Sequence, residues 1–133
     1  MKRLTNKEIK KSIRTIPNFP KKGIMFRDIT TLLNNKKIFQ RTIDTIVNIA
    51  KKKKVNKIVG IDSRGFIFAA PVAYKCKLPL ILVRKQGKLP GQTYKIKYSL
   101  EYGFGTLEIN RESIKKNEKV MVIDDLIATG GTA

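Results

Sequence analysis

The residues best suited to chemistry lie near the end of the chain, where an apolar run passes directly into two carboxylates. Val120 to Ile123 contains no polar residue, which is typical of a strand covered on both faces in a parallel sheet. Asp124 and Asp125 follow at once, and residues 128–132 then read Ala-Thr-Gly-Gly-Thr. Ligands of open parallel sheets bind beyond the carboxyl ends of the strands. Because glycines expose backbone N–H groups and threonines add hydroxyl donors, this loop predicts a phosphate site.

The two carboxylates need a different part of the same ligand, because like charges repel. Vicinal hydroxyls of a sugar donate hydrogen bonds and are natural partners for an acid pair. A phosphorylated ribose fits the whole motif, with its sugar on Asp124 and Asp125 and its 5′-phosphate on residues 128–132. A lone Gly-Gly loop after a buried strand would instead indicate an ordinary turn.

This motif, residues 123–132, resembles the phosphoribosyl pyrophosphate (PRPP) motif of the type I phosphoribosyltransferases, and the likeness extends over essentially all 133 residues. The resemblance implies an α/β fold, a parallel sheet flanked by helices with a flexible hairpin lid and an N-terminal base-binding segment. It implies transfer of the 5-phosphoribosyl group of PRPP to adenine, giving AMP and pyrophosphate. It also implies Mg2+ held mainly through PRPP, and a homodimer. The ribose 5-phosphate would be bound by Asp124, Asp125, Ala128, Thr129, Gly130, Gly131 and Thr132.

Two more apolar segments, residues 57–62 and 79–83, predict strands that also end in polar loops. The first loop leads into an apolar helix predicted over about 66–75, and a small-residue loop at a helix N-terminus favours anions. On the residues alone, two alternatives stay open: the loop after residues 57–62 is an ordinary strand-to-helix turn, and the lysines after residues 79–83 are surface charges. The resemblance assigns pyrophosphate binding to Ser63, Arg64, Arg84, Lys85 and Lys88.

The N-terminal region begins with a capping box, Thr5 with Glu8, which predicts a short helix to about Ile13. Two prolines and a glycine in residues 16–23 predict an ordered loop without regular structure. Residues 35–50 carry apolar side chains at spacings of three and four, which predicts a long amphipathic helix.

The resemblance assigns adenine binding to Met25, Phe26 and Arg27. Main-chain groups of Met25 and Arg27 would meet the edge of the base, while Phe26 stacks on its ring. An adjacent donor and acceptor select a 6-amino purine, because a 6-oxo purine reverses that polarity. On the residues alone, a purely structural alternative stays open, in which Phe26 belongs to the core and Arg27 forms an ion pair with Asp28.

Residues 93–103 alternate polar and larger side chains and approach a glycine-rich turn, which predicts a hairpin. The resemblance makes it a lid that carries Glu101 and Tyr102. Glu101 would act as acid or base near N7 of adenine, and Tyr102 would shield the reaction from water. Glu101, Arg64, Asp124 and Asp125 are therefore the predicted catalytic residues.

Composition limits the remaining classes of function. The formal charge of +19 suggests nucleic-acid binding as a candidate function. Because the sequence has no groove-reading motif, a solvated cationic surface is favoured. The chain has no histidine, which excludes Ser-His-Asp machinery and Cys/His zinc sites. Its single cysteine allows no intrachain disulfide, which favours the cytoplasm, and no apolar run reaches the length of a membrane span. The rival readings are a PRPP-sensing regulator of the same fold that binds nucleic acid, and a transferase for another purine.

Length predicts a single domain over residues 1–133. Members of the resembled family continue beyond the position of Ala133 into a helix and further strands. The resemblance therefore predicts a domain incomplete at the C-terminus, with one exposed sheet face and with weak or absent activity.

Overall fold

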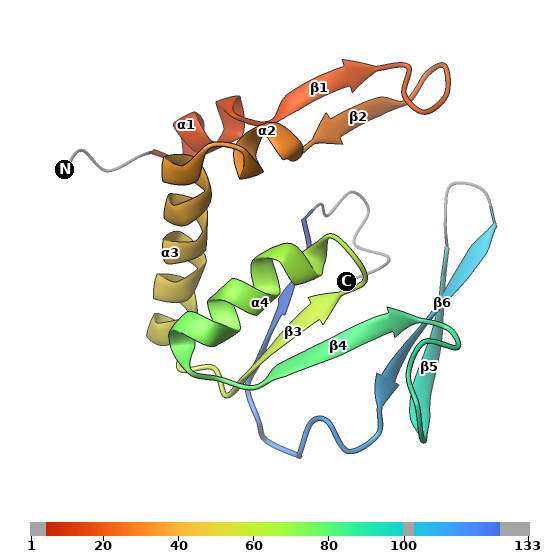
Figure 1. The fold of residues 1–133 in the computed structure, drawn as a ribbon. Coiled ribbons are helices and arrows are strands. Elements are labelled where there is room, and N and C mark those ends of the chain that lie inside the picture. The colour runs from red at the N-terminus through yellow and green to blue at the C-terminus, as the bar shows by residue number, and fades with distance from the viewer. Residues whose placement is uncertain (1–4, 100–102, 126–133) are drawn as a thin grey trace. The chain divides into compact units, whose positions relative to one another are not determined.

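The computed structural model describes residues 5–99 and 103–125 (Figure 1). The chain forms two compact units, Met1–Ile46 and Val47–Ala133. The elements in chain order are α1 (Asn6–Lys11), β1 (Arg14–Pro17), β2 (Met25–Asp28), α2 (Thr30–Leu33), α3 (Lys36–Lys53), β3 (Lys57–Ile61), α4 (Gly65–Cys76), β4 (Leu80–Lys85), β5 (Thr93–Ser99), β6 (Phe104–Asn110) and β7 (Val120–Ile123).

The first unit confirms the predicted capping box. The Glu8 N–H donates to the Thr5 hydroxyl at 3.3 Å, and the Thr5 N–H donates to the Glu8 carboxylate at 2.6 Å. The prediction that residues 16–23 lack regular structure is wrong at its start, because β1 runs to Pro17 and pairs antiparallel with β2. A proline is tolerated at a strand end, where its missing N–H removes no ladder hydrogen bond.

Helix α3 was predicted over residues 35–50 and spans Lys36–Lys53. Ile43, Val47 and Ala50 are its buried residues, at spacings of four and three that place them on one face. The Asn35 side chain accepts the Ile38 N–H at 3.2 Å, which satisfies a donor of the first turn. The last turn carries Lys51, Lys52 and Lys53. Cations are favoured there by the helix dipole, so no ligand is needed to explain them.

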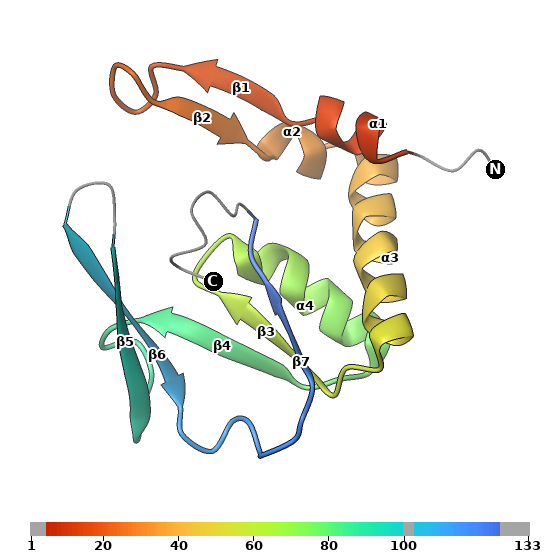
Figure 2. The ribbon, with the colours of Figure 1, turned by 180° about the vertical axis from the view of Figure 1, so that it is seen from behind.

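The second unit is built on a five-stranded sheet in the order β5-β6-β4-β3-β7 (Figures 1 and 2). Strand β3 pairs in parallel with both β4 and β7, so the three apolar segments form the predicted parallel core. The hairpin of β5 and β6 is antiparallel and joins the sheet where Arg84 of β4 pairs with Glu108 of β6. The sheet is therefore mixed, and the hairpin continues it at one edge.

Helix α4 packs on one face of this sheet. A Cβ built on Gly60 of β3 would lie 2.8 Å from the Cβ of Ala69, so the two elements are closer than any larger residue at position 60 would allow. In the described part of the chain, the opposite face keeps an apolar groove of about 550 Å³, lined among others by Val59, Ile61 and Val83. Ile96 and Val122 on this groove are 67% and 47% exposed.

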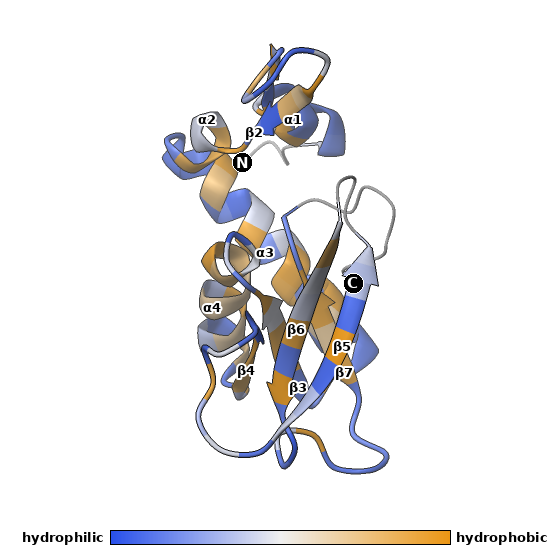
Figure 3. Ribbon diagram, turned by 90° about the vertical axis from the view of Figure 1, so that its right-hand side faces the viewer, coloured by the Kyte–Doolittle hydropathy of each residue, from blue (hydrophilic) through white to orange (hydrophobic). Residues whose placement is uncertain are grey.

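Hydropathy alternates along the hairpin strands, as Figure 3 shows for β5 and β6. Side chains in register share a face, so Ile96 of β5 and Leu107 of β6 both belong to the apolar side. Lys95 and Lys97 of β5 point the other way. Among the residues described, no helix has the length and apolar character needed to cross a membrane.

Candidate active site

The loop after β3 reaches both neighbouring strands of the sheet, because β3 is the middle strand of the parallel core. The Asp62 N–H donates to the carbonyl of Val83 at 2.9 Å, which extends the pairing with β4 by one residue. The chain then turns through a cis Asp62–Ser63 peptide into α4, whose N-cap is Arg64. Polar side chains from three strand ends therefore meet here.

On the β7 side, Arg64 and Asp125 form an ion pair. The Arg64 Nε lies 2.8 Å from the Asp125 Oδ2, and the Asp125 side chain is only 6% exposed. A carboxylate so deeply buried requires a cation or several donors to stabilise its charge. The predicted pyrophosphate cation and a predicted ribose carboxylate are thus brought together.

The acid pair itself is connected by a local hydrogen bond, from the Asp125 N–H to the Asp124 Oδ1 at 2.8 Å. Burial raises the pKa of the Asp124 carboxyl above its ordinary value, and the neighbouring Asp125 adds to this shift. The Asp125 N–H and the Arg64 charge oppose it. Two adjacent carboxylates near one guanidinium can accept two hydroxyl donors from a ligand.

Gly65 allows the start of α4 to approach the end of β7. A Cβ at this position would lie 2.7 Å from the carbonyl oxygen of Ile123 and 3.2 Å from the Cα of Asp124. Glycine is required here by close packing rather than by its backbone angles. Sequence reasoning treated Gly65 as part of an anion loop and did not anticipate this contact.

On the β4 side, the carboxylate of Asp62 faces two candidate pyrophosphate residues. Its Oδ2 accepts the Lys85 N–H at 3.3 Å and lies 3.5 Å from the Arg84 Nε. Ser63, Lys85 and Lys88 are exposed, as residues that receive a charged ligand would be. Sequence reasoning missed Asp62 as a site residue. The signal was available, because Asp62 follows a buried strand just as Asp124 does.

The predicted base-binding residues lie on β2 of the first unit. The Met25 side chain is 58% exposed, and Phe26 meets Phe19 edge-on with ring centroids 5.1 Å apart. Arg27 donates to the hydroxyl of Thr15, whereas Asp28 pairs with Arg14. The alternative of an ion pair between Arg27 and Asp28 is therefore wrong.

The pairing of β1 and β2 also decides which main-chain groups of β2 face outward. Pro17 has no N–H, so the pair Pro17 with Met25 cannot exchange two hydrogen bonds. Antiparallel pairs alternate, which makes Ile16 with Phe26 the hydrogen-bonded pair and leaves Thr15 with Arg27 non-bonded. The N–H and C=O groups of Met25 and Arg27 consequently point away from β1. No other described strand pairs with β2.

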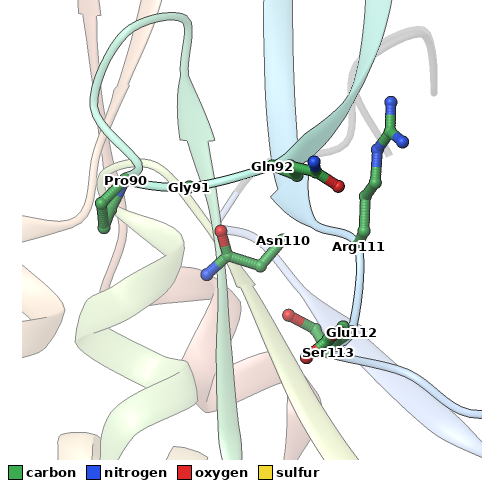
Figure 4. Close-up of a pocket in the computed structure, with 7 residues that line it drawn as sticks. All are labelled: Pro90, Gly91, Gln92, Asn110, Arg111, Glu112 and Ser113. Atoms are coloured by element: carbon green, nitrogen blue, oxygen red, sulfur yellow. The ribbon is translucent and has the colours of Figure 1, made fainter.

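Another hollow, of about 520 Å³, lies at the open end of the β5–β6 hairpin (Figure 4). Gln92, Asn110 and Arg111 are among its lining residues. Strand β6 runs antiparallel to β4, so Asn110 lies toward the amino end of the parallel strands. None of the predicted site residues lines this hollow, and it is separate from the candidate active site.

Several predicted site residues lie outside the described residues, and their roles stay predictions. They are Glu101, Tyr102, Ala128, Thr129, Gly130, Gly131 and Thr132. Within residues 5–99 and 103–125, no three side chains of His, Cys, Asp or Glu are grouped to hold a metal ion.

Comparisons of the sequence and of the structure with known proteins both find phosphoribosyltransferases. Residues 28–133 match the phosphoribosyl transferase domain family. The adenine phosphoribosyltransferase of Treponema denticola is 51% identical over 129 residues, which cover 97% of this chain and 68% of that protein. The crystal structure of adenine phosphoribosyltransferase from Thermoanaerobacter pseudethanolicus superposes with a TM-score of 0.88 at 44% identity, covering 96% of this chain and 74% of that one.

A second solved structure holds ligands. The enzyme of the same name from Saccharomyces cerevisiae, in complex with adenine and an imino-altritol bisphosphate, gives a TM-score of 0.88 at 38% identity. The match covers 95% of this chain and 74% of the yeast chain.

Proposed function

Since the chain belongs to the phosphoribosyl transferase family, we propose that it transfers the 5-phosphoribosyl group of PRPP to adenine, giving AMP and pyrophosphate. This is a reaction of purine salvage, and it makes the protein a pentosyl transferase. The observation that carries the proposal is the meeting of Asp124, Asp125 and Arg64 at the ends of β3 and β7. A buried acid pair beside a cation suits a ligand that joins sugar hydroxyls to phosphate groups.

The ribose is assigned to the acid pair. Asp124 and Asp125 would accept hydrogen bonds from its hydroxyls, which fixes the ring relative to the strand ends. Departure of pyrophosphate leaves positive charge on the sugar, and nearby carboxylates stabilise that charge in a site with little water. The 5′-phosphate is assigned to residues 128–132, on the strength of their sequence alone.

The pyrophosphate is assigned to Ser63, Arg64, Arg84, Lys85 and Lys88. Arg64 is the N-cap of α4, and Arg84 and Lys85 are the last residues of β4, so all three lie at the carboxyl ends of neighbouring parallel strands. Ligands of such sheets collect there. Guanidinium groups suit this role because their planar fork matches two phosphate oxygens at once.

Adenine is assigned to the outer edge of β2. The outward N–H and C=O groups of Met25 and Arg27 offer a donor beside an acceptor, which is the pattern that a 6-amino purine requires. Phe26 would stack on the base, with Phe19 supporting the ring from its edge. A 6-oxo purine would leave a main-chain group unpaired, so adenine is preferred.

The chemical step is a displacement at C1′ of the ribose. The adenine N9 forms a bond to C1′ while the bond from C1′ to the pyrophosphate oxygen breaks, and the electron pair leaves with pyrophosphate. The protein contributes mainly by holding the two groups in line. Adenine loses one imidazole proton as N9 bonds to C1′, and Glu101 is proposed to accept it at N7. Tyr102 is proposed to exclude water. Both roles come from the sequence resemblance.

Mg2+ is proposed as the cofactor, held mainly by oxygens of PRPP. The donors fit this arrangement, because the described residues offer an acid pair but no three-carboxylate cage, and Mg2+ keeps few protein ligands when phosphates are present. When bound, it would neutralise charge on the departing pyrophosphate. A cytoplasmic homodimer completes the proposal.

The test is PRPP-dependent formation of AMP by the purified chain. We expect adenine to be converted, at the weak rate that the sequence predicts, and hypoxanthine and guanine to compete poorly. Turnover of hypoxanthine at a comparable rate would contradict the assignment of the base. A gel-shift titration at physiological salt distinguishes the proposed transferase from a PRPP-sensing regulator. Tight nucleic-acid binding without AMP formation would support the regulator.

A further inference from the structure

We propose that Asp62 is a positioning residue of the pyrophosphate site, which holds the Arg84 side chain and the Lys85 main chain in place for a diphosphate. The proposal rests on the proposed function, since Arg84 and Lys85 are taken there as pyrophosphate ligands. Asp62 itself would touch no substrate. It would affect pyrophosphate binding only by positioning Arg84 and Lys85 at the end of β4.

The geometry places one carboxylate oxygen between two parts of the neighbouring strand. The Asp62 Oδ2 lies 3.5 Å from the Arg84 Nε and accepts the Lys85 N–H at 3.3 Å. The Asp62 main chain is fixed as well, because its N–H donates to Val83 at 2.9 Å. The carboxylate therefore joins the end of β3 to both the side chain and the backbone at the end of β4.

The burial of Asp62 supports a positioning role for its contact with Arg84. The Asp62 side chain is 9% exposed, and a carboxylate in such a place is costly unless a cation faces it. A negative charge also repels an anionic ligand. An acid inside a pyrophosphate site is therefore unfavourable for binding unless it improves the placement of the cations around it.

Arg84 has a second buried carboxylate on its other side. Glu108 of β6 is directly in register with Arg84, so their side chains share one face of the sheet. The Glu108 side chain is 5% exposed, and its Oε1 lies 3.5 Å from the Nζ of Lys95 on β5. Charges thus alternate from Asp62, directly after β3, to Arg84 on β4, Glu108 on β6 and Lys95 on β5. Such a row limits the rotamers of Arg84.

The atoms involved leave the binding end of Arg84 available. Asp62 faces the Nε, on the inner side of the guanidinium fork. The two terminal nitrogens of the fork carry the paired donors that match two oxygens of a phosphate. An ion pair with Asp62 on the Nε side favours side-chain conformations in which those donors point away from Asp62, which reduces the entropy lost on binding.

The experiment measures inorganic pyrophosphate binding by calorimetry, with Mg2+ present, and PRPP kinetics in parallel. For Asp62→Asn we expect the Kd for pyrophosphate and the KM for PRPP to rise about tenfold, with the KM for adenine within about twofold. If charge alone mattered, removing the carboxylate would tighten pyrophosphate binding. An unchanged or lower Kd would therefore overturn the proposal.

A double-mutant cycle tests whether Asp62 acts through Arg84. Arg84→Lys keeps the charge but lacks the Nε, and we expect it to weaken pyrophosphate binding to a similar degree. In the Arg84→Lys background, Asp62→Asn should add at most about a twofold further loss. Independent, multiplying effects would overturn the proposed route. If Asp62→Asn fails to fold, Arg84→Lys alone still decides, because unchanged binding in that variant contradicts the proposal.

The matched control is Glu112→Gln, which removes one negative charge from an exposed loop residue after β6. It should leave the Kd for pyrophosphate unchanged. A wild-type chain that binds pyrophosphate but forms no AMP would count against the proposed function only. A wild-type chain that does not bind pyrophosphate would count against the positioning role itself.

Discussion

Arg64 and Asp125 neutralise each other across the ends of β3 and β7, with the Nε of one 2.8 Å from the Oδ2 of the other. One of these residues is assigned to the pyrophosphate and the other to the ribose of the same substrate. The pair stabilises a carboxylate whose side chain is almost fully buried. Binding of PRPP would give Arg64 a pyrophosphate partner and Asp125 a ribose partner, so the ion pair would couple the pyrophosphate and ribose parts of the site.

Asp125→Asn should lower turnover while the fold stays intact. The neutral side chain keeps the shape of aspartate but gives less stabilisation to the positive charge that develops on the ribose, and it loses the ion pair with Arg64. We expect kcat to fall about tenfold to a hundredfold, or about 1.4–2.7 kcal/mol of transition-state stabilisation. Steady-state kinetics and far-UV circular dichroism check both parts. Unchanged kcat in a folded variant would refute the role of Asp125.

Gly65→Ala and Gly60→Ala form a matched pair, because both add one methyl group to a crowded position. At Gly65 the methyl would meet Ile123 and Asp124, and at Gly60 it would meet Ala69 of α4. Both should cost about 1–3 kcal/mol of stability, measured by urea unfolding. Only Gly65→Ala should also raise the KM for PRPP, since only that methyl displaces the acid pair. Equal KM values in the two variants would contradict this.

Asp28 should make the stability of the chain depend on acid pH. Hydrogen bonds from the Thr30 side chain and N–H, together with Arg14, lower the pKa of Asp28 from 3.8 to about 2. Because the pKa is lower in the folded state, its contribution is complete above about pH 4 and is lost as the pH falls toward 2. The difference in Tm between wild type and Asp28→Asn should therefore shrink over that interval.

Thr30→Ala is the control for this pH effect. It removes the largest single cause of the shift, so the pKa of Asp28 should move back toward its ordinary value. The Tm of Thr30→Ala should then change less between pH 4 and pH 2 than that of the wild type. An identical pH dependence in all three proteins would show that Asp28 does not contribute.

Phe26→Leu should weaken adenine binding more than PRPP binding. Leucine retains apolar character but has no ring face for the base, and a stacked aromatic pair contributes about 0.5–1.5 kcal/mol beyond area burial. We expect the KM for adenine to rise about threefold to tenfold at this loss, with the KM for PRPP nearly unchanged. Leu33→Met, a volume-conserving change in α2, is the control. A rise in both KM values to the same extent would argue for a purely structural Phe26.

Removal of divalent metal should abolish AMP formation without unfolding the chain. The described residues form no three-carboxylate metal cage, so Mg2+ is expected to arrive with PRPP rather than to support the fold. Excess EDTA should stop turnover, and Mg2+ in excess of EDTA should restore it. The Tm without substrate should not change on chelation. Turnover in EDTA would exclude the proposed cofactor.

The sequence by itself determined the elements that support the site. Unbroken apolar runs at 58–61, 80–83 and 120–123 are typical of strands in a parallel sheet, so they predicted the parallel core that β3, β4 and β7 form. The capping box at Thr5 and the amphipathic pattern of α3 were readable for the same reason, since each is a local regularity. Sequence also indicated that polar residues would gather at the strand ends.

Only the tertiary structure decided which of those polar residues pair. Arg64 and Asp125 are far apart in sequence, and the ion pair between them depends on β3 lying beside β7. The contact of Asp62 with Arg84 depends in the same way on the register of β3 and β4. β1 was missed because a strand of this length that ends in Pro17 carries no periodic signal, and the strand exists only through its pairing with β2. Cross-strand partners are set by register, and register is a property of the packed sheet rather than of any one segment.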